Sequence, residues 1–96
     1  MPLFVAEHKH SADHCPAADS KMAPMLLRHL SAPNASKFGI KIQGEAVIDG
    51  GHTLYLILDA PDAKKVNEFM APFAQAGSVK VQPASPCEVV VTRGKC

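Results

Sequence analysis

The chain has 96 residues, enough for one domain over residues 1–96 with a single thin core. Ten basic and nine acidic residues leave a formal net charge of +1 without a basic stripe, which argues against nucleic acid or an anionic membrane as a partner. One Tyr, four Phe and no Trp also offer few platforms for stacking single-stranded bases.

The start of the chain does not have the pattern of a signal peptide. The short apolar run 1–6 is followed at once by charged residues and histidines. The longer apolar runs, such as 54–58, have only a few residues, far below the roughly 20 that cross a bilayer. We therefore expect a soluble, cytoplasmic protein. Its odd number of cysteines, three, favours thiols, metal ligands or redox chemistry over a disulfide framework.

The first half of the chain predicts a strand, a helix and a second strand. Residues 3–10 are compatible with a strand whose side chains alternate. Apolar residues at helical spacing predict a helix over 17–30, with Pro24 at its start or at a kink. Residues 31–36 have the composition of a loop. Residues 39–48 alternate as a strand that ends in a glycine turn, and its polar face carries Lys41, Gln43 and Glu45.

The second half predicts a strand, a helix and two more strands. Residues 53–58 are apolar on both faces, as in a central strand. A helix then runs from an N-cap at Asp62 to Gly77, bent or broken near Pro72, with one apolar face formed by Val66, Phe69, Met70 and Phe73. Residues 78–82 alternate as a strand, and the valine-rich segment 87–92 predicts a further strand after a proline-rich turn.

This order of elements, β-α-β-β-α-β, resembles the ferredoxin-like α+β fold. At this length it looks like the dimeric α/β-barrel superfamily, in which two such sheets pack face to face. The segments 22–25 and 70–73 also have similar sequences at similar places in the two halves. The resemblance implies a homodimer or higher homo-oligomer. Members include monooxygenases, isomerases, haem-handling enzymes and metal-binding proteins, so the resemblance selects no function.

A cluster of potential metal ligands lies at the end of the first strand. His8 and His10 are two residues apart, so they lie on one face and can bind one ion. His14 and Cys15 follow and add a nitrogen and a sulfur donor, which suit zinc, copper, nickel or iron. The alternative is that these side chains are only polar residues at the rim of a sheet.

The cysteines allow further interpretations. Cys15 precedes Pro16 and the first predicted helix, whose dipole would favour a reactive thiolate. Alternatively, Cys15 packs as a small hydrophobic residue. Cys87 becomes a weaker ligand candidate if the last strand folds beside the first. Cys96 is the last residue of the sequence, and we expect it to have no fixed position.

The remaining polar and sulfur-containing residues have simpler interpretations. The polar face of the second strand, together with Tyr55, would line a cavity between two subunits or form hydrogen bonds there. His29 is expected to interact with the dipole at a helix end, and His52 to be exposed in a turn. The methionines at helical spacing are expected to fill the core between helices and sheet, namely Met22, Met25 and Met70.

Two functions of different classes follow. The first is a small transition-metal carrier or sensor that binds its ion through His8, His10, His14 and Cys15. The alternative is a small dimeric-barrel enzyme, similar to an isomerase or a monooxygenase, that acts on a small-molecule ligand in the sheet cavity. In that enzyme the acid and base groups would be Glu45, Tyr55 or His8.

Overall fold

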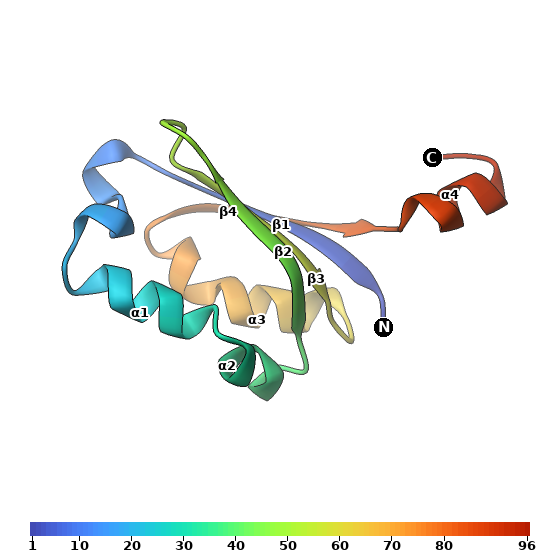
Figure 1. Cartoon of the computed structure of the whole chain (residues 1–96), viewed down its shortest axis with the longest axis horizontal. Coiled ribbons are helices and arrows are strands. Elements are labelled where there is room, and N and C mark those ends of the chain that lie inside the picture. Colours follow the sequence, from blue (N-terminus) through green and yellow to red (C-terminus); the bar gives the residue numbers. More distant parts are fainter.

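The computed structural model describes residues 1–96 as an α+β fold, which confirms the predicted class. Its four strands form one antiparallel sheet in the order β2-β3-β1-β4, which is seen from the side in Figure 1. This order is consistent with a ferredoxin-like arrangement. The strands are β1 (Leu3–His10), β2 (Lys41–Ile48), β3 (Thr53–Asp59) and β4 (Gly77–Ala84).

Three of the four α-helices cover one face of the sheet, and the last projects away from it (Figure 1). The helices are α1 (Met22–His29), α2 (Ala32–Lys37), α3 (Ala63–Ala74) and α4 (Cys87–Arg93). Two short 3-10 turns, Ala12–His14 and Pro16–Ala18, connect β1 to α1. None of these helices has the length and apolar character needed to cross a membrane.

Strand β1 lies in the middle of the sheet and organises the core. It pairs with β3 on one side and β4 on the other. Because strand side chains alternate, Phe4, Ala6 and His8 all point to the face that the helices cover, and all three are buried. The hydrophobic core lies between this face and α3, together with buried residues of α2, of β3 and of the loops, namely Ala35, Ile40, Leu54, Leu56, Leu58 and Ala60.

Helix α3 forms as its sequence predicts. The Asp62 carboxylate accepts a hydrogen bond from the Lys65 amide at 2.9 Å, which caps the first turn. The four apolar residues of the predicted face are buried, namely Val66, Phe69, Met70 and Phe73. Pro72 lies inside the last turn of the helix. The helix therefore presents one continuous apolar face to the sheet.

Helix α1 begins later than predicted and packs loosely. It starts at Met22 because the Asp19 carboxylate accepts hydrogen bonds from the amides of Lys21 and Met22 at 2.8 and 3.1 Å. Pro24 lies in the first turn, where a missing N–H costs little. The helix buries no residue, and Met22 and Met25 are 44% and 57% exposed. The prediction that these two methionines fill the core is wrong, whereas Met70 is buried as predicted.

The similar segments 22–25 and 70–73 are not structurally equivalent. Met22 opens α1 and is partly exposed, whereas Met70 is in the second half of α3 and is buried. The similarity in sequence therefore does not reflect a repeat in the fold.

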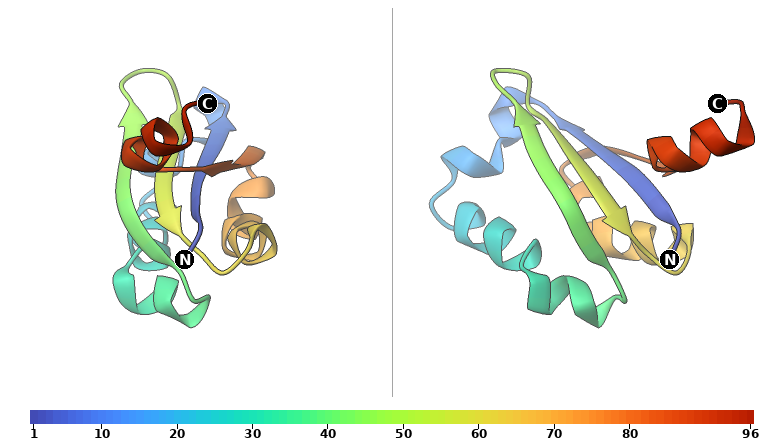
Figure 2. Two further views of the ribbon diagram at one scale, coloured as in Figure 1. Left: turned by 90° about the vertical axis from the view of Figure 1, so that its right-hand side faces the viewer. Right: turned by 45° about the vertical axis from the view of Figure 1, so that its right-hand side comes forward.

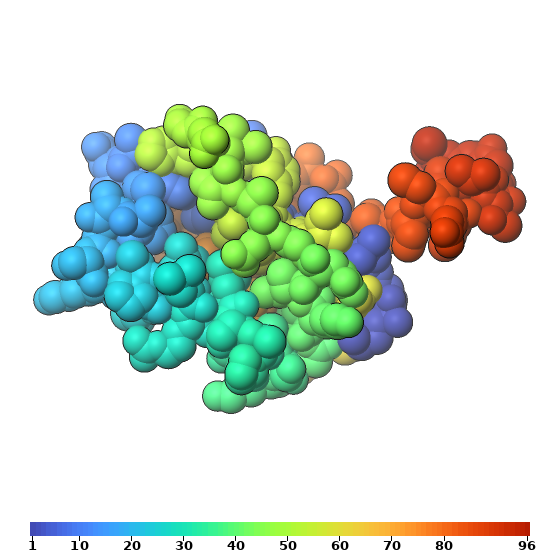
Figure 3. Space-filling model, in the orientation of Figure 1, coloured from blue at the N-terminus to red at the C-terminus, as the bar shows by residue number.

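Two segments differ in type from their predictions. Residues 32–37, within the expected loop and just after it, form α2, because Ser31 is extended and Pro33 lies in the first turn, where proline is favoured. The segment 87–92, predicted as a strand, lies in α4. No neighbouring strand is present to pair with it, and an unpaired backbone satisfies its own hydrogen bonds as a helix. Helix α4 buries no residue and lies apart from the domain in the space-filling view (Figure 3).

An irregularity in β2 changes the face on which Glu45 lies. The register between β2 and β3 shifts between Ile42 and Gly44, so Gln43 is an extra residue in the ladder. Beyond it, Glu45 pairs with Leu56 on the face covered by helices, while Tyr55 points to the other face. The expectation that Lys41, Gln43, Glu45 and Tyr55 share one face is therefore wrong for Glu45.

The second face of the sheet carries no helix, as the views in Figure 2 show. We call it the open face. The strand register places alternating aliphatic and charged residues on it, including Leu3, Val5, Glu7, Tyr55, Ile57 and Lys80. Ile57, in the centre of this face, is 45% exposed. Ile57 pairs with Val5 across the strands, and a contiguous exposed apolar patch often marks an interaction site.

Two valines provide a matched test of this packing. Val66 in α3 is fully buried, whereas Val91 in α4 is 77% exposed. Val66→Ala removes two buried methyl groups and should lower the free energy of unfolding by about 2 kcal/mol. Val91→Ala should change it by less than about 0.5 kcal/mol. Urea unfolding of both variants measures the difference, and equal losses would contradict the described positions of α3 and α4.

Candidate metal centre

The site begins where the core side of β1 changes from apolar to polar residues. His8 and His10 continue the row formed by Phe4 and Ala6, so both imidazoles lie on the helix-covered face. Their rings stack with centroids 5.3 Å apart. His8 is 2% exposed and also packs against the ring of Phe73, 5.1 Å away. The two-residue spacing in the sequence therefore does bring these side chains together.

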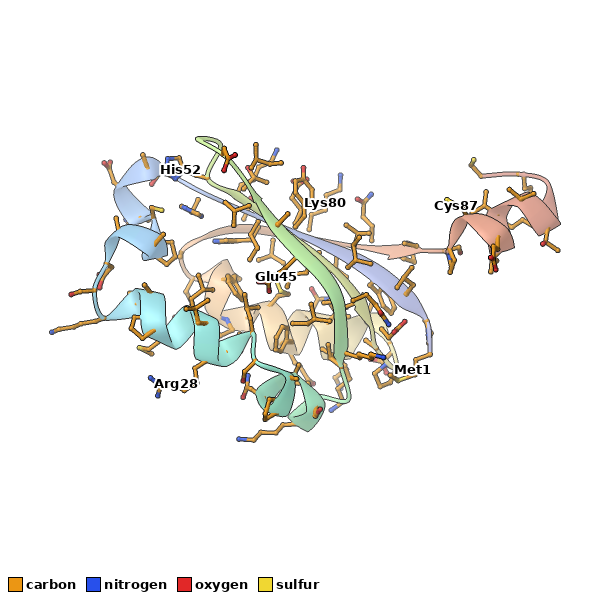
Figure 4. All side chains as sticks on the ribbon, in the orientation of Figure 1. Met1, Arg28, Glu45, His52, Lys80 and Cys87 are labelled. Atoms are coloured by element: carbon orange, nitrogen blue, oxygen red, sulfur yellow. The ribbon has the colours of Figure 1, made fainter.

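A third imidazole comes from the turn between β2 and β3. The turn passes through Gly50, with a φ of 70°, to His52, which itself has a φ of 49°. The His10 amide donates a hydrogen bond to the His52 carbonyl at 3.1 Å, which extends the pairing of β1 with β3 and fixes the turn beside His10. The two rings are 5.2 Å apart. Figure 4 shows His52 at this end of the sheet, so the expectation of a simply exposed turn residue is wrong.

Cys15 completes the group from the connection between β1 and α1. It lies between the two 3-10 turns, where its amide donates to the Ala12 carbonyl and its carbonyl accepts from the Ala18 amide. These turns fold the chain back toward β1. One ligand atom each of His10, Cys15 and His52 lies within 4.8 Å of the other two. We call these three residues the His/Cys site.

The imidazole of His10 has unsatisfied hydrogen-bonding capacity. Both ring nitrogens are buried, and no protein atom forms a hydrogen bond with either. Burial lowers the pKa of His10 below its ordinary value, and the charges that His8, His52 and His14 would carry lower it further. The ring is therefore neutral at neutral pH. A neutral imidazole with a free lone pair is the form that binds a metal ion.

His8 has one engaged and one free nitrogen. Its Nδ1 lies 3.0 Å from the Ser78 carbonyl oxygen. Because a carbonyl only accepts, Nδ1 carries the proton and Nε2 carries the lone pair. The Nε2 atom is buried without a partner. Burial lowers the pKa of His8 and the bond to Ser78 opposes this shift. His8 adjoins the His/Cys site without belonging to the group of three.

Other residues predicted for this chemistry lie outside the His/Cys site. His14 is exposed, and its Nδ1 forms a 2.8 Å hydrogen bond with the Ser11 hydroxyl. Cys87 lies on the projecting helix α4, at the opposite end of the molecule from His52 (Figure 4). Cys96 is exposed beyond the same helix. The α-helix predicted from residue 17 begins at Met22, seven residues after Cys15, so no α-helix dipole acts on its thiol.

The three acid and base groups expected of an enzyme do not meet in one site. Glu45 and His8 lie on the covered face, at the edge strand β2 and the central strand β1. Tyr55 lies on the open face, opposite Glu7 in the strand register. The interaction of its hydroxyl with the Glu7 carboxylate lowers the pKa of Glu7 and raises the pKa of Tyr55. The sheet itself therefore separates Tyr55 from the other two groups.

His52 is the residue of this site that sequence reasoning missed. The signal was present in the predicted topology, because the start of β3 pairs with the end of β1 in an antiparallel sheet. The residue before β3 therefore lies beside His10. Its position in a glycine turn made it look like an ordinary exposed residue.

The comparisons with known proteins provide a family but no activity. A family model described as a domain of unknown function, DUF3303, matches residues 4–95. No curated protein and no solved structure matches the chain. Functional inference therefore depends on the side chains of this chain.

The hydrogen bond of His8 leads to a direct prediction. At neutral pH, nitrogen-15 NMR should show His8 as the tautomer with the proton on Nδ1, because the Ser78 carbonyl needs a donor. The exposed His14 provides an internal control that should exchange its ring proton rapidly. A His8 ring protonated on Nε2 would contradict the described contact.

Proposed function

The chain belongs to the DUF3303 family, and we propose that it is a small transition-metal-binding protein, a carrier or a sensor, that uses His10, Cys15 and His52. The observation that carries this proposal is the pair of buried, unpartnered nitrogens of His10. A buried polar atom without a partner costs about 1–3 kcal/mol. A bound ion removes part of this cost by accepting one of the lone pairs.

The donor set determines which ions fit. Two imidazoles and one thiolate are borderline to soft ligands, which suit zinc, copper, nickel or iron and do not suit magnesium or calcium. Three protein ligands also leave one position of a tetrahedral ion free. A free position allows an ion to be exchanged with another protein, which is what a carrier requires, or to be sensed through a small change in structure.

The positions of the three ligands support a small change in structure when an ion binds. Cys15 and His52 come from a two-turn connection and a glycine turn, both at the end of the sheet. His10 is fixed in the central strand by its pairing with Gly77. An added Cβ on Gly77 would lie 2.0 Å from the Lys9 carbonyl oxygen, so this close approach of β4 to β1 requires glycine. The ion would therefore draw two adaptable segments onto one rigid ligand.

Single substitutions test the ligand set. In a protein purified without an affinity tag, calorimetry should show saturable binding of zinc at neutral pH. Loss of a residue that only hydrogen-bonds to a metal ligand lowers metal affinity by about 10–100-fold. His10→Ala and His52→Ala each remove a ligand itself, so each should lower the zinc affinity by more than this. Cys15→Ser should weaken Cu(I) binding more than Ni(II) binding, because it removes the soft ligand.

His14→Ala is the matched control for these variants. It removes an exposed imidazole close in sequence to Cys15 but outside the His/Cys site, so zinc affinity should not change. If His10→Ala and His14→Ala bind zinc equally, the histidines are only polar residues at the end of the sheet, and the proposal is wrong.

We further propose that a second copy of the chain covers the open face, which makes the protein a homodimer. A compact monomer of this mass exposes about 5,300 Å², whereas the chain has an accessible surface of 6350 Å², and the projecting helix α4 contributes to this excess. The aliphatic residues of the open face support this proposal, since no helix of the same chain reaches them.

Light scattering of the unmodified protein and of two lysine variants tests the dimer. The unmodified protein should have twice the chain mass of 10.2 kDa at micromolar concentration. Ile57→Lys places a charge in the open face and should yield a monomer. Leu27→Lys places the same charge on α1, where Leu27 is 69% exposed, and should remain a dimer. A monomeric unmodified protein contradicts the proposal and leaves metal binding unaffected.

A further inference from the structure

A separate cavity lies on the helix-covered side of the sheet, between α1 and the end of α3. Its volume is about 200 Å³. One wall is formed by α1, mainly by Met25 and Leu26, and the other by Pro72 and Phe73 of α3. His8 lines it from β1. We call it the interhelical cavity. The His/Cys site does not line it.

The lining of this cavity is apolar except for two imidazoles. The other seven lining residues are all methionine, proline, leucine, phenylalanine or alanine. His29 uses both of its ring nitrogens, since Nε2 lies 2.7 Å from the Phe69 carbonyl and Nδ1 lies 3.3 Å from the Asn34 amide nitrogen. Among the lining residues, the buried side-chain nitrogen that has no hydrogen-bond partner is therefore Nε2 of His8.

The absence of a proton on Nε2 of His8 determines which ligand groups this nitrogen can bind. Nδ1 of His8 donates to the Ser78 carbonyl, so Nε2 is a hydrogen-bond acceptor. His8 is 2% exposed, so the ring is held in place by β4 and Phe73 and cannot turn to solvent. A buried acceptor in an apolar cavity is complementary to a molecule with one donor group on an apolar body.

The α1 wall of the cavity is loosely packed. Helix α1 buries no residue, and Met22 and Met25, which both line the cavity, are largely exposed. Methionine side chains are unbranched and adapt to the shape of a ligand. The size also agrees with one ring, because an engineered apolar cavity of about 150 Å³ binds benzene.

We propose that the interhelical cavity binds a small aromatic molecule that carries one O–H or N–H donor, such as a phenol, and that this donor bonds to Nε2 of His8. The ring of the ligand lies between α1 and α3, against Leu26 and Phe73. The inference does not depend on the His/Cys site, and the ligand needs no metal ion to bind.

Phenol and toluene are the probes, because they have nearly the same shape and differ in the donor group. They are titrated separately into metal-free protein with a chelator present, and amide shifts are followed by NMR. Phenol should bind saturably and shift the amides of Leu26, Phe73 and Ala76. Toluene should bind about five to ten times more weakly, since it leaves Nε2 without a partner, although toluene is the more apolar molecule.

Two variants test where the ligand binds, and a third is the control. His8→Leu removes the acceptor and should abolish the preference for phenol, and the far-ultraviolet circular dichroism checks that the variant is folded. Ala76→Leu fills the end of the interhelical cavity and should weaken both probes. His14→Ala lies outside the cavity and should bind both probes as the unmodified protein does.

The result that overturns the inference is equal affinity for the two probes in the unmodified protein, or shifts confined to residues away from α1 and α3. Because no metal is present, that result does not bear on the His/Cys site. Loss of zinc binding in His10→Ala, conversely, does not bear on the interhelical cavity.

Discussion

The alternation of side chains along β1 is the constraint on which the rest of this structure depends. The central strand is covered on one face only, so each second residue enters the space beneath the helices. Phe4 and Ala6 fill that space as hydrophobic core, and His8 and His10 enter it with polar rings. The end of the sheet that carries the His/Cys site is therefore a direct continuation of the core.

The imidazole rings on this face are removed from water without forming all of their hydrogen bonds. Both nitrogens of His10 and one of His8 are buried without partners, and each costs about 1–3 kcal/mol. The fold tolerates this cost because β3 and α3 complete a close-packed apolar core elsewhere. A ligand that restores the missing contacts gains that energy on binding. The two proposed ligands, an ion at the His/Cys site and a small molecule in the interhelical cavity, would use this principle with different atoms, the nitrogens of His10 and the Nε2 of His8.

Much of the architecture follows from local sequence rules. The alternating strands and the amphipathic α3 with its Asp62 cap form as predicted, because these patterns agree with their tertiary environment. One incorrect prediction concerns a segment that has no partner element. The valines of 87–92 have high strand propensity but no neighbouring strand, so they form α4. The bulge at Gln43 reverses the faces of β2 through a register that no periodicity reveals.

The sequence by itself determined the pairing of His8 with His10, because a spacing of two on a strand fixes a common face. It also identified Cys15 as a ligand candidate through its proximity along the chain. Only the tertiary structure decided that His52 joins this group while His14 does not. The physical reason is that strand pairing brings the turn before β3 beside the end of β1, a contact between residues about 40 positions apart that a local pattern does not contain.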